Sequence, residues 1–177
     1  MAIVLLLGGA RSGKSAMAMR LASDSGAPVT FIATAQPGDE EMAARIERHR
    51  DDRPPSWKTL EAPVDLLSAV RASDADNFIV LDCLTLWVSN LLGDGSSPDQ
   101  IEAAACEVIA ALQDRSGVVV TNEVGLGIVP ANDLARSFRD VLGTVNSLFA
   151  DAAGRSVLMV AGRAIELSST KSVLGPL

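Results

Sequence analysis

The segment that most constrains the fold is residues 3–15, IVLLLGGARSGKS, in which an apolar run breaks into a glycine-rich loop. Gly8, Gly13, Lys14 and Ser15 match G-x-x-x-x-G-K-[ST], the pattern of a phosphate-binding loop between a strand and a helix. Glycines let backbone N–H groups turn toward phosphate oxygens, while the lysine neutralises the β- and γ-phosphates and the serine hydroxyl ligates Mg²⁺. We therefore predict that this loop binds a phosphate and is not an ordinary turn.

Four more apolar runs of strand length follow, and helical patterns lie between them. The runs are continuous, as expected for strands buried on both faces of a sheet. The expected strands are 3–7, 29–33, 78–82, 118–122 and 157–161, and the expected helices are at about 14–23, 39–50, 63–72, 84–92, 98–113 and 132–152. This order predicts an α/β protein of the P-loop NTPase type, with a mostly parallel sheet and helices on both faces.

The length of 177 residues predicts a single P-loop nucleotide-binding domain over 1–177, with a loosely ordered tail at 168–177. The formal net charge of -7 argues against a nucleic-acid partner. No apolar stretch approaches the ~20 residues that span a bilayer, and MAIVLLLGG lacks the basic segment of a signal peptide. Cys83 and Cys106 lie in apolar surroundings without metal-type spacing, which predicts reduced core cysteines in a cytoplasmic protein.

A partner for the metal should lie where a neighbouring strand ends. Asp82 closes the apolar run FIVLD and has the position of an acid that holds Mg²⁺ directly or through water. The alternative is that Asp82 caps the helix that follows it. Glu123, after VVVTN, is a second strand-end acid for which a structural role is an equal alternative.

Three classes of nucleotide protein share such a loop. A GTPase switch is disfavoured because the base-reading N-K-x-D pattern is absent. A mechanical or recombination-type ATPase fits poorly with the acidic charge and the small size. A small-molecule kinase on the same fold remains.

The segment ARIERHRDDRPPSW carries the only histidine of the chain, His49, among Arg45, Arg48, Arg50 and Arg53. One interpretation is a solvated helix face. The other is a group of guanidinium side chains that bind phosphates, beside a histidine that attacks a phosphorus atom.

Several long motifs occur in an order shared with one family. They are GGARSGKS, RIERHRDDRP, the W and LEAP that follow it, LDCLTLWVSNLL, and TNEVGLGIVPANDLARSFRDVLGTVNSLFADAA. Over about residues 3–162 the chain resembles the bifunctional adenosylcobinamide kinase / adenosylcobinamide-phosphate guanylyltransferases of cobalamin biosynthesis. The resemblance implies that a nucleoside triphosphate phosphorylates the corrinoid adenosylcobinamide. GMP from GTP is then transferred to that phosphate, giving adenosylcobinamide-GDP and pyrophosphate.

The resemblance also implies roles for individual residues. His49 is the position that becomes covalently bonded to GMP, and Lys14 is catalytic in the kinase step. Glu61 is expected to read the guanine, because a carboxylate accepts two parallel hydrogen bonds. Mg²⁺ is expected on Ser15 and Asp82, with GTP and ATP as nucleotide substrates. The implied nucleotide contacts are Gly8, Gly9, Ala10, Arg11, Ser12, Gly13, Lys14, Ser15, Ala33, Thr34, Ala35, Arg50, Asp51, Asp52, Arg53, Glu61 and Asp82.

The resemblance implies a homotrimer. Helix-spaced apolar residues at Leu134, Phe138, Val141, Val145 and Leu148 are either core or subunit interface. The C-terminal segment GRAIELSSTKSVLGPL departs from the family pattern. The segment 39–57 is expected to move between the two reactions, because His49 must reach the α-phosphorus. Two alternatives are a P-loop small-molecule kinase without nucleotidyl transfer and a nucleotide-binding regulatory protein.

Overall fold

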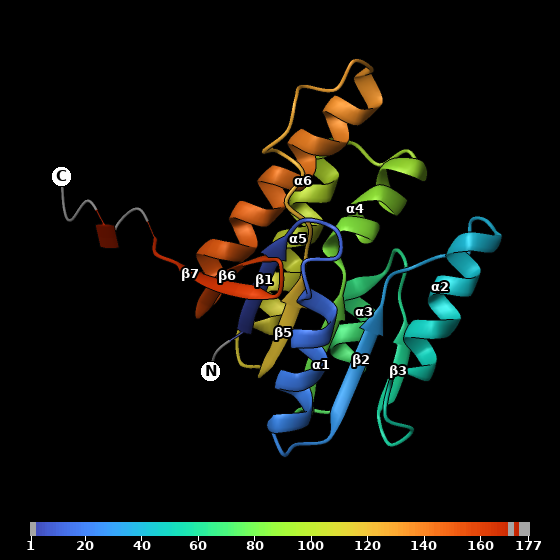
Figure 1. Ribbon diagram of the computed structural model, residues 1–177, viewed down its shortest axis with the longest axis vertical. Helices are drawn as coiled ribbons and strands as arrows, with labels where there is room; N and C mark the ends of the chain where they lie inside the picture. Colours follow the sequence, from blue (N-terminus) through green and yellow to red (C-terminus); the bar gives the residue numbers. More distant parts are fainter. Residues whose placement is uncertain (1–2, 170–171, 174–177) are drawn as a thin grey trace.

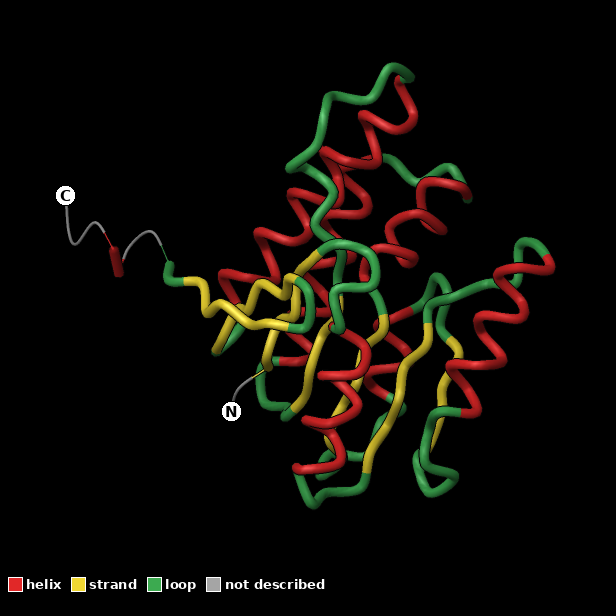
Figure 2. The backbone as a smooth tube through the Cα atoms, in the orientation of Figure 1, coloured by secondary structure: helices red, strands yellow, loops and turns green. Residues whose placement is uncertain are grey.

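The computed structural model describes residues 3–169 and 172–173, and within them a central sheet carries helices on both faces (Figures 1 and 2). The strands are β1 (Ile3–Gly8), β2 (Val29–Ala33), β3 (Lys58–Glu61), β4 (Phe78–Asp82), β5 (Gly117–Val120), β6 (Arg155–Val160) and β7 (Arg163–Leu167). The helices are α1 (Lys14–Asp24), α2 (Glu40–Asp51), α3 (Leu66–Arg71), α4 (Leu84–Gly93), α5 (Pro98–Leu112) and α6 (Asp133–Ala152).

The strand order is β3-β2-β4-β5-β1-β6-β7, and every pair is parallel except β6 with β7. The register places the carboxyl ends of five strands level with one another. One row across the sheet consists of Glu61, Ala33, Asp82, Val120 and Leu6. Ligands of open parallel sheets bind at this edge, so the row defines where a site is expected.

Two apolar layers hold the sheet. On one face α1 packs through Ala18 and Ala22 against side chains of β1, β2, β4 and β5. On the other face α3, α4, α5 and α6 form the larger layer, around Trp87 and Leu142. Helix α2 belongs to neither layer: none of its residues is buried, and it lies at the β3 edge of the sheet (Figure 1).

The predicted P-loop α/β fold is confirmed, and the five expected strands and six expected helices all occur. The edge strands β3 and β7 were not predicted. Helix α3 begins later than expected, at Leu66, because the side chain of Asp65 caps it by accepting from Ser68 N–H. Most of the predicted tail 168–177 lies outside the described residues.

Two expectations about side chains are corrected or resolved. Cys83 is buried as predicted, but Cys106 is exposed on α5 and is not a core residue. The apolar stripe of α6 divides along its length, because Val141 and Val145 are buried whereas Leu134 is 71% exposed.

Candidate active site

The loop between β1 and α1 is shaped by two glycines. Gly8 has φ 152°, and a Cβ atom there would lie 2.3 Å from the carbonyl oxygen of Met159 on β6. Gly13 has φ 99° and occupies the N-cap position of α1. Gly162, in the turn between β6 and β7, donates its backbone N–H to the carbonyl of Ser12 at 3.0 Å. The loop is therefore fixed from both sides, by its own backbone and by the neighbouring hairpin.

Lys14 is buried in the hollow of this loop. Its ammonium group donates to the carbonyls of Gly8 at 2.8 Å and Gly9 at 2.7 Å. Burial lowers the pKa of Lys14, and the nearby Cys83 and Asp82 oppose that shift. A phosphate bound by the loop would give this ammonium a charged acceptor in place of two neutral carbonyls.

The ends of β2 and β4 are joined by hydrogen bonds through Thr34. Its hydroxyl accepts from Cys83 N–H at 2.8 Å and donates to Cys83 C=O at 2.7 Å. Asn90 of α4 donates to the carbonyls of Thr34 and Pro63. Burial, reinforced by Asp82, raises the pKa of the Cys83 thiol to about 11, so it is no nucleophile at neutral pH. Cys83 is also the N-cap residue of α4, so the alternative helix-cap role for Asp82 is not found.

A cleft of about 630 Å³ opens beside the P-loop, between the sheet edge and α2. It brings together residues from the P-loop, the ends of three strands (β2, β3 and β4) and α2 that are far apart in the sequence. Its lining is Ser15, Phe31, Ala33, Ala35, Met42, Arg45, Ile46, His49, Arg50, Arg53, Glu61, Asp82, Cys83 and Leu86. Eight of these residues were predicted from the sequence.

Helix α2 presents one face to this cleft, at Met42, Arg45, Ile46, His49 and Arg50. Their spacing of three and four residues is that of one helix face. Asp39 caps the helix by accepting from Met42 N–H at 2.7 Å. Ile46 and Arg45 lie three and four residues before His49 and therefore share its helix face. This periodicity could have identified the additional α2 lining residues from the sequence.

Two contacts connect the α2 region to the sheet. Arg50 forms an ion pair with Glu61 at the end of β3. Beyond the helix, the guanidinium carbon of Arg53 lies 3.8 Å from the ring centroid of Phe31, a cation–π contact. The Nε of Arg53 is buried and has no hydrogen-bond partner among the described residues. Burial lowers the pKa of Arg53, although Asp82 and Glu61 counteract it.

Some predicted contacts lie elsewhere. Asp51 and Asp52 are exposed and do not line the cleft. Thr34 is fully buried behind the cleft, and its hydroxyl instead connects the ends of β2 and β4 through the backbone of Cys83. Gly9, Ala10 and Arg11 form the exposed rim of the P-loop. The lining residues that the sequence did not predict are Phe31, Met42, Ile46, Cys83 and Leu86, whereas Arg45 was considered as one of the clustered arginines.

Ser15 and Asp82 line the same cleft, and their side-chain oxygen atoms are donors that suit a hard cation. Among the described residues there is no cluster of three or more His, Cys, Asp or Glu side chains that could hold a metal. Mg²⁺ needs no such cluster, because it is commonly held by one or two side chains, water and substrate phosphates. The donors present therefore fit Mg²⁺ bound together with a nucleotide.

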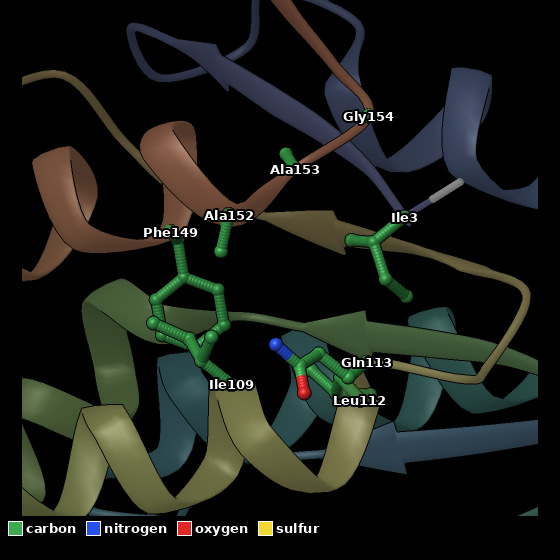
Figure 3. Close-up of a pocket in the computed structure, with 8 residues that line it drawn as sticks. All are labelled: Ile3, Ile109, Leu112, Gln113, Phe149, Ala152, Ala153 and Gly154. Atoms are coloured by element: carbon green, nitrogen blue, oxygen red, sulfur yellow. The ribbon is translucent and has the colours of Figure 1, made fainter. Parts of the chain in front are cut away.

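A second hollow, of about 390 Å³, lies at the start of β1, away from the carboxyl ends of the strands (Figure 3). Ile3 begins β1 there, beside Leu112 and Phe149 near the ends of α5 and α6. Gln113 is its only polar side chain, and none of the predicted site residues lines it. The predicted site residues therefore gather at the carboxyl ends of the strands and not at this hollow.

Comparison with known proteins identifies the family. A sequence model of the family described as cobinamide kinase / cobinamide phosphate guanyltransferase matches residues 4–167. The bifunctional adenosylcobalamin biosynthesis protein CobP of Pseudomonas aeruginosa is 45% identical over 161 residues, covering 89% of this chain and 92% of its own length. The corresponding CobU protein of Salmonella typhimurium is 44% identical over 180 residues, covering 93% and 99% of the two chains.

Solved structures support the fold. The chain resembles an ATPase from the type III secretion system of pathogenic bacteria with a TM-score of 0.56, at 11% identity and with 98% of this chain and 60% of that chain covered. At that identity the likeness concerns the fold alone. The family match and the two relatives are more specific, and they agree with the resemblance found in the motifs. The chain therefore belongs to the cobinamide kinase / cobinamide phosphate guanyltransferase family.

Proposed function

We propose that this protein carries out both reactions of its family on corrinoid substrates, using the P-loop for one and His49 for the other. The observation that carries this proposal is the shared cleft, which is lined by Ser15 of the P-loop and by His49 of α2. Covalent nucleotidyl transfer requires a nucleophile in the cleft, and neither a plain kinase nor a regulatory nucleotide-binding protein requires one.

In the first reaction the aminopropanol hydroxyl of adenosylcobinamide attacks the γ-phosphorus of ATP or GTP. The oxygen–phosphorus bond forms, the bond to the β-phosphate oxygen breaks, and a nucleoside diphosphate leaves. Lys14 and the loop N–H groups stabilise the negative charge on the transferred group. Ser15 and Asp82 would hold Mg²⁺, which neutralises charge on the β- and γ-phosphates.

In the second reaction an imidazole nitrogen of His49 attacks the α-phosphorus of GTP, and pyrophosphate leaves. A phosphate oxygen of adenosylcobinamide phosphate then attacks the same phosphorus atom. The phosphorus–nitrogen bond breaks, adenosylcobinamide-GDP forms and His49 is restored. Arg45, Arg50 and Arg53 line the cleft beside His49 and supply positive charge for the phosphates.

Selection of guanine is assigned to Glu61, whose carboxylate would accept from the N1–H and the exocyclic amine. In the present state that carboxylate pairs with Arg50, so guanine binding would exchange one partner for another. A Glu61→Ala enzyme that keeps its full preference for GTP over ATP would overturn this role.

Assembly and location belong to the same proposal. Leu126, Ile128, Val129 and Leu134 are 84%, 98%, 62% and 71% exposed and follow one another in the sequence before and at the start of α6. A surface of this kind suits contact with further copies, which supports the homotrimer implied by the resemblance. Among the helices of the described residues, none combines the length and apolar character needed to cross a bilayer. The cytoplasmic location and the single-domain organisation stay predictions.

The proposal is tested by intact-mass measurement after incubation with GTP and Mg²⁺, without corrinoid. We expect a gain of one GMP that is lost on acid treatment, because a phosphorus–nitrogen bond is acid-labile. His49→Ala should remain unmodified.

Arg48→Ala is the matched control, because Arg48 is exposed on the same helix but does not line the cleft. This variant should still gain GMP. If the wild type binds GTP but gains no mass, the nucleotidyl-transfer role of His49 is wrong and a simple kinase becomes the better description.

A further inference from the structure

Glu123 is a strand-end acid that the two reactions above leave unused. It follows β5, which lies between β1 and β4 in the sheet. The register row places Val120 between Leu6 of β1 and Asp82 of β4. Glu123 therefore follows the strand that separates the P-loop from the predicted metal ligand.

The backbone of this segment is attached directly to the P-loop. Glu123 N–H donates to the carbonyl of Gly8 at 3.1 Å, and the ammonium of Lys14 donates to the same oxygen at 2.8 Å. Glu123 and Lys14 are thus joined through one acceptor. The position of Glu123 relative to a bound phosphate is set by the same residue that shapes the loop.

A buried polar network holds the residue before it. Asn122 N–H donates to the hydroxyl of Thr85 at 2.7 Å, and Asn146 donates to the carbonyl of Asn122 at 3.0 Å. Thr121 completes the network by donating to the side-chain oxygen of Asn146 at 2.7 Å. Thr85, Thr121 and Asn146 are buried, and such networks fix a unique geometry when every group is satisfied. Here the geometry that they fix is that of Asn122 and Glu123.

The carboxylate itself is available for chemistry. Within the described residues Glu123 forms no ion pair, and it accepts the backbone N–H of Gly125. It does not line the cleft that holds His49, so it lies outside the surface assigned to the nucleotidyl step. In-line transfer requires the acceptor hydroxyl to approach the γ-phosphorus from the side opposite the leaving oxygen, so the acceptor needs its own surface.

From this placement we propose that Glu123 is the general base of the kinase step. Its carboxylate takes the proton of the acceptor hydroxyl as that oxygen bonds to the γ-phosphorus, and the nucleoside diphosphate leaves with the electrons of the broken bond. The proton passes from Glu123 to solvent after product release. The inference rests on the kinase activity proposed above.

The test compares two reactions of one protein. Glu123→Gln keeps the shape of the side chain and removes the base. We expect its kcat for adenosylcobinamide phosphorylation to fall about 10²- to 10⁴-fold, the usual contribution of a general base, with KM little changed. Guanylylation by GTP in the absence of corrinoid should stay within about threefold of the wild type, because that reaction does not use the acceptor hydroxyl.

Three further variants sharpen the result. Glu107→Gln makes the same isosteric change at an exposed position of α5 and should leave both reactions unchanged. Glu123→Asp should retain part of the kinase activity. Gly125→Ala should lower kinase kcat without removing the carboxylate, because a Cβ there would lie 2.9 Å from the Glu123 oxygen.

The outcomes distinguish an error in the role of Glu123 from an error in the proposed kinase function. A Glu123→Gln enzyme with wild-type kinase kcat overturns the role of Glu123. Equal loss of phosphorylation and guanylylation also overturns it, because the residue would then be structural. If the wild type guanylylates His49 but phosphorylates no corrinoid, the kinase function itself is wrong, and this inference fails with it.

Discussion

The P-loop and helix α2 face the same cleft but are held in place by different interactions. The P-loop packs into the sheet: Gly8 lies against Met159, Lys14 is buried, and Gly162 bonds to the loop from the next hairpin. Helix α2 has no buried residue and is connected through an exposed ion pair of Arg50 with Glu61.

This difference matches the two reactions. Phosphoryl transfer depends on donors fixed around the phosphates before the reaction begins. The proposed attack by His49 at a second phosphorus atom would instead require the nucleophile to adjust its position relative to the bound nucleotide. The rigid P-loop therefore suits phosphoryl transfer, and the loosely attached helix α2 suits nucleotidyl transfer. We predict from this arrangement that α2 moves.

The largest expected effect comes from disrupting the close packing of the P-loop against β6. Gly8→Ala places a Cβ against the carbonyl oxygen of Met159 at a backbone angle that other residues rarely adopt. We expect the free energy of unfolding to fall by at least about 2 kcal/mol, and both activities to be lost. Thermal or urea unfolding measures the first effect, and the corrinoid and GMP-adduct assays measure the second.

Gly9→Ala is the control for that change. A Cβ at this position meets nothing within 4 Å, so the stability of the variant should match that of the wild type. If Gly8→Ala were as stable as Gly9→Ala, the close packing of the loop against β6 would not be what fixes it.

The contrast also explains how far the sequence could predict this molecule. The P-loop was predictable because each requirement is local: a glycine where the backbone turns, and a lysine and serine at fixed spacing. Asp82 and Glu61 are brought together only by strand order and register, which no local pattern reveals. Their joint placement was expected from the resemblance and not from the residues themselves.

The elements that escaped prediction lack a buried face. In β3 only Leu60 is even partly buried, and every residue of β7 is exposed, so no apolar pattern marks either strand. The prediction that Cys106 is a core residue was wrong for a related reason. The buried positions of α5 are Ile101, Ala105, Val108 and Leu112, and their helical spacing places Cys106 off that face, although its neighbours in the sequence are apolar.

An intermediate effect is expected in backbone hydrogen exchange. Helices α1 and α2 have similar lengths, 11 and 12 residues, but only α1 has buried residues. Amides of α2 should exchange at least about 100-fold faster than those of α1, because opening α2 breaks little packing. Adding GTP and Mg²⁺ should slow exchange in α2 of the wild type more than in His49→Ala, since covalent GMP connects the helix to the nucleotide site. Equal protection of both helices would contradict a loosely attached α2.

The smallest effect is expected from the ion pair that connects α2 to β3. The side chains of Arg50 and Glu61 are 51% and 58% exposed, so water screens their attraction. A double-mutant cycle with Arg50→Ala, Glu61→Gln and the combined variant should give a coupling energy below about 1 kcal/mol in urea unfolding. Raising the ionic strength from low salt to 0.5 M should reduce that coupling further, to about zero. A coupling of about 2 kcal/mol or more that persists in salt would mean that α2 is fixed to the sheet as firmly as the P-loop. His49 would then have to reach the α-phosphorus by rotation of its side chain alone.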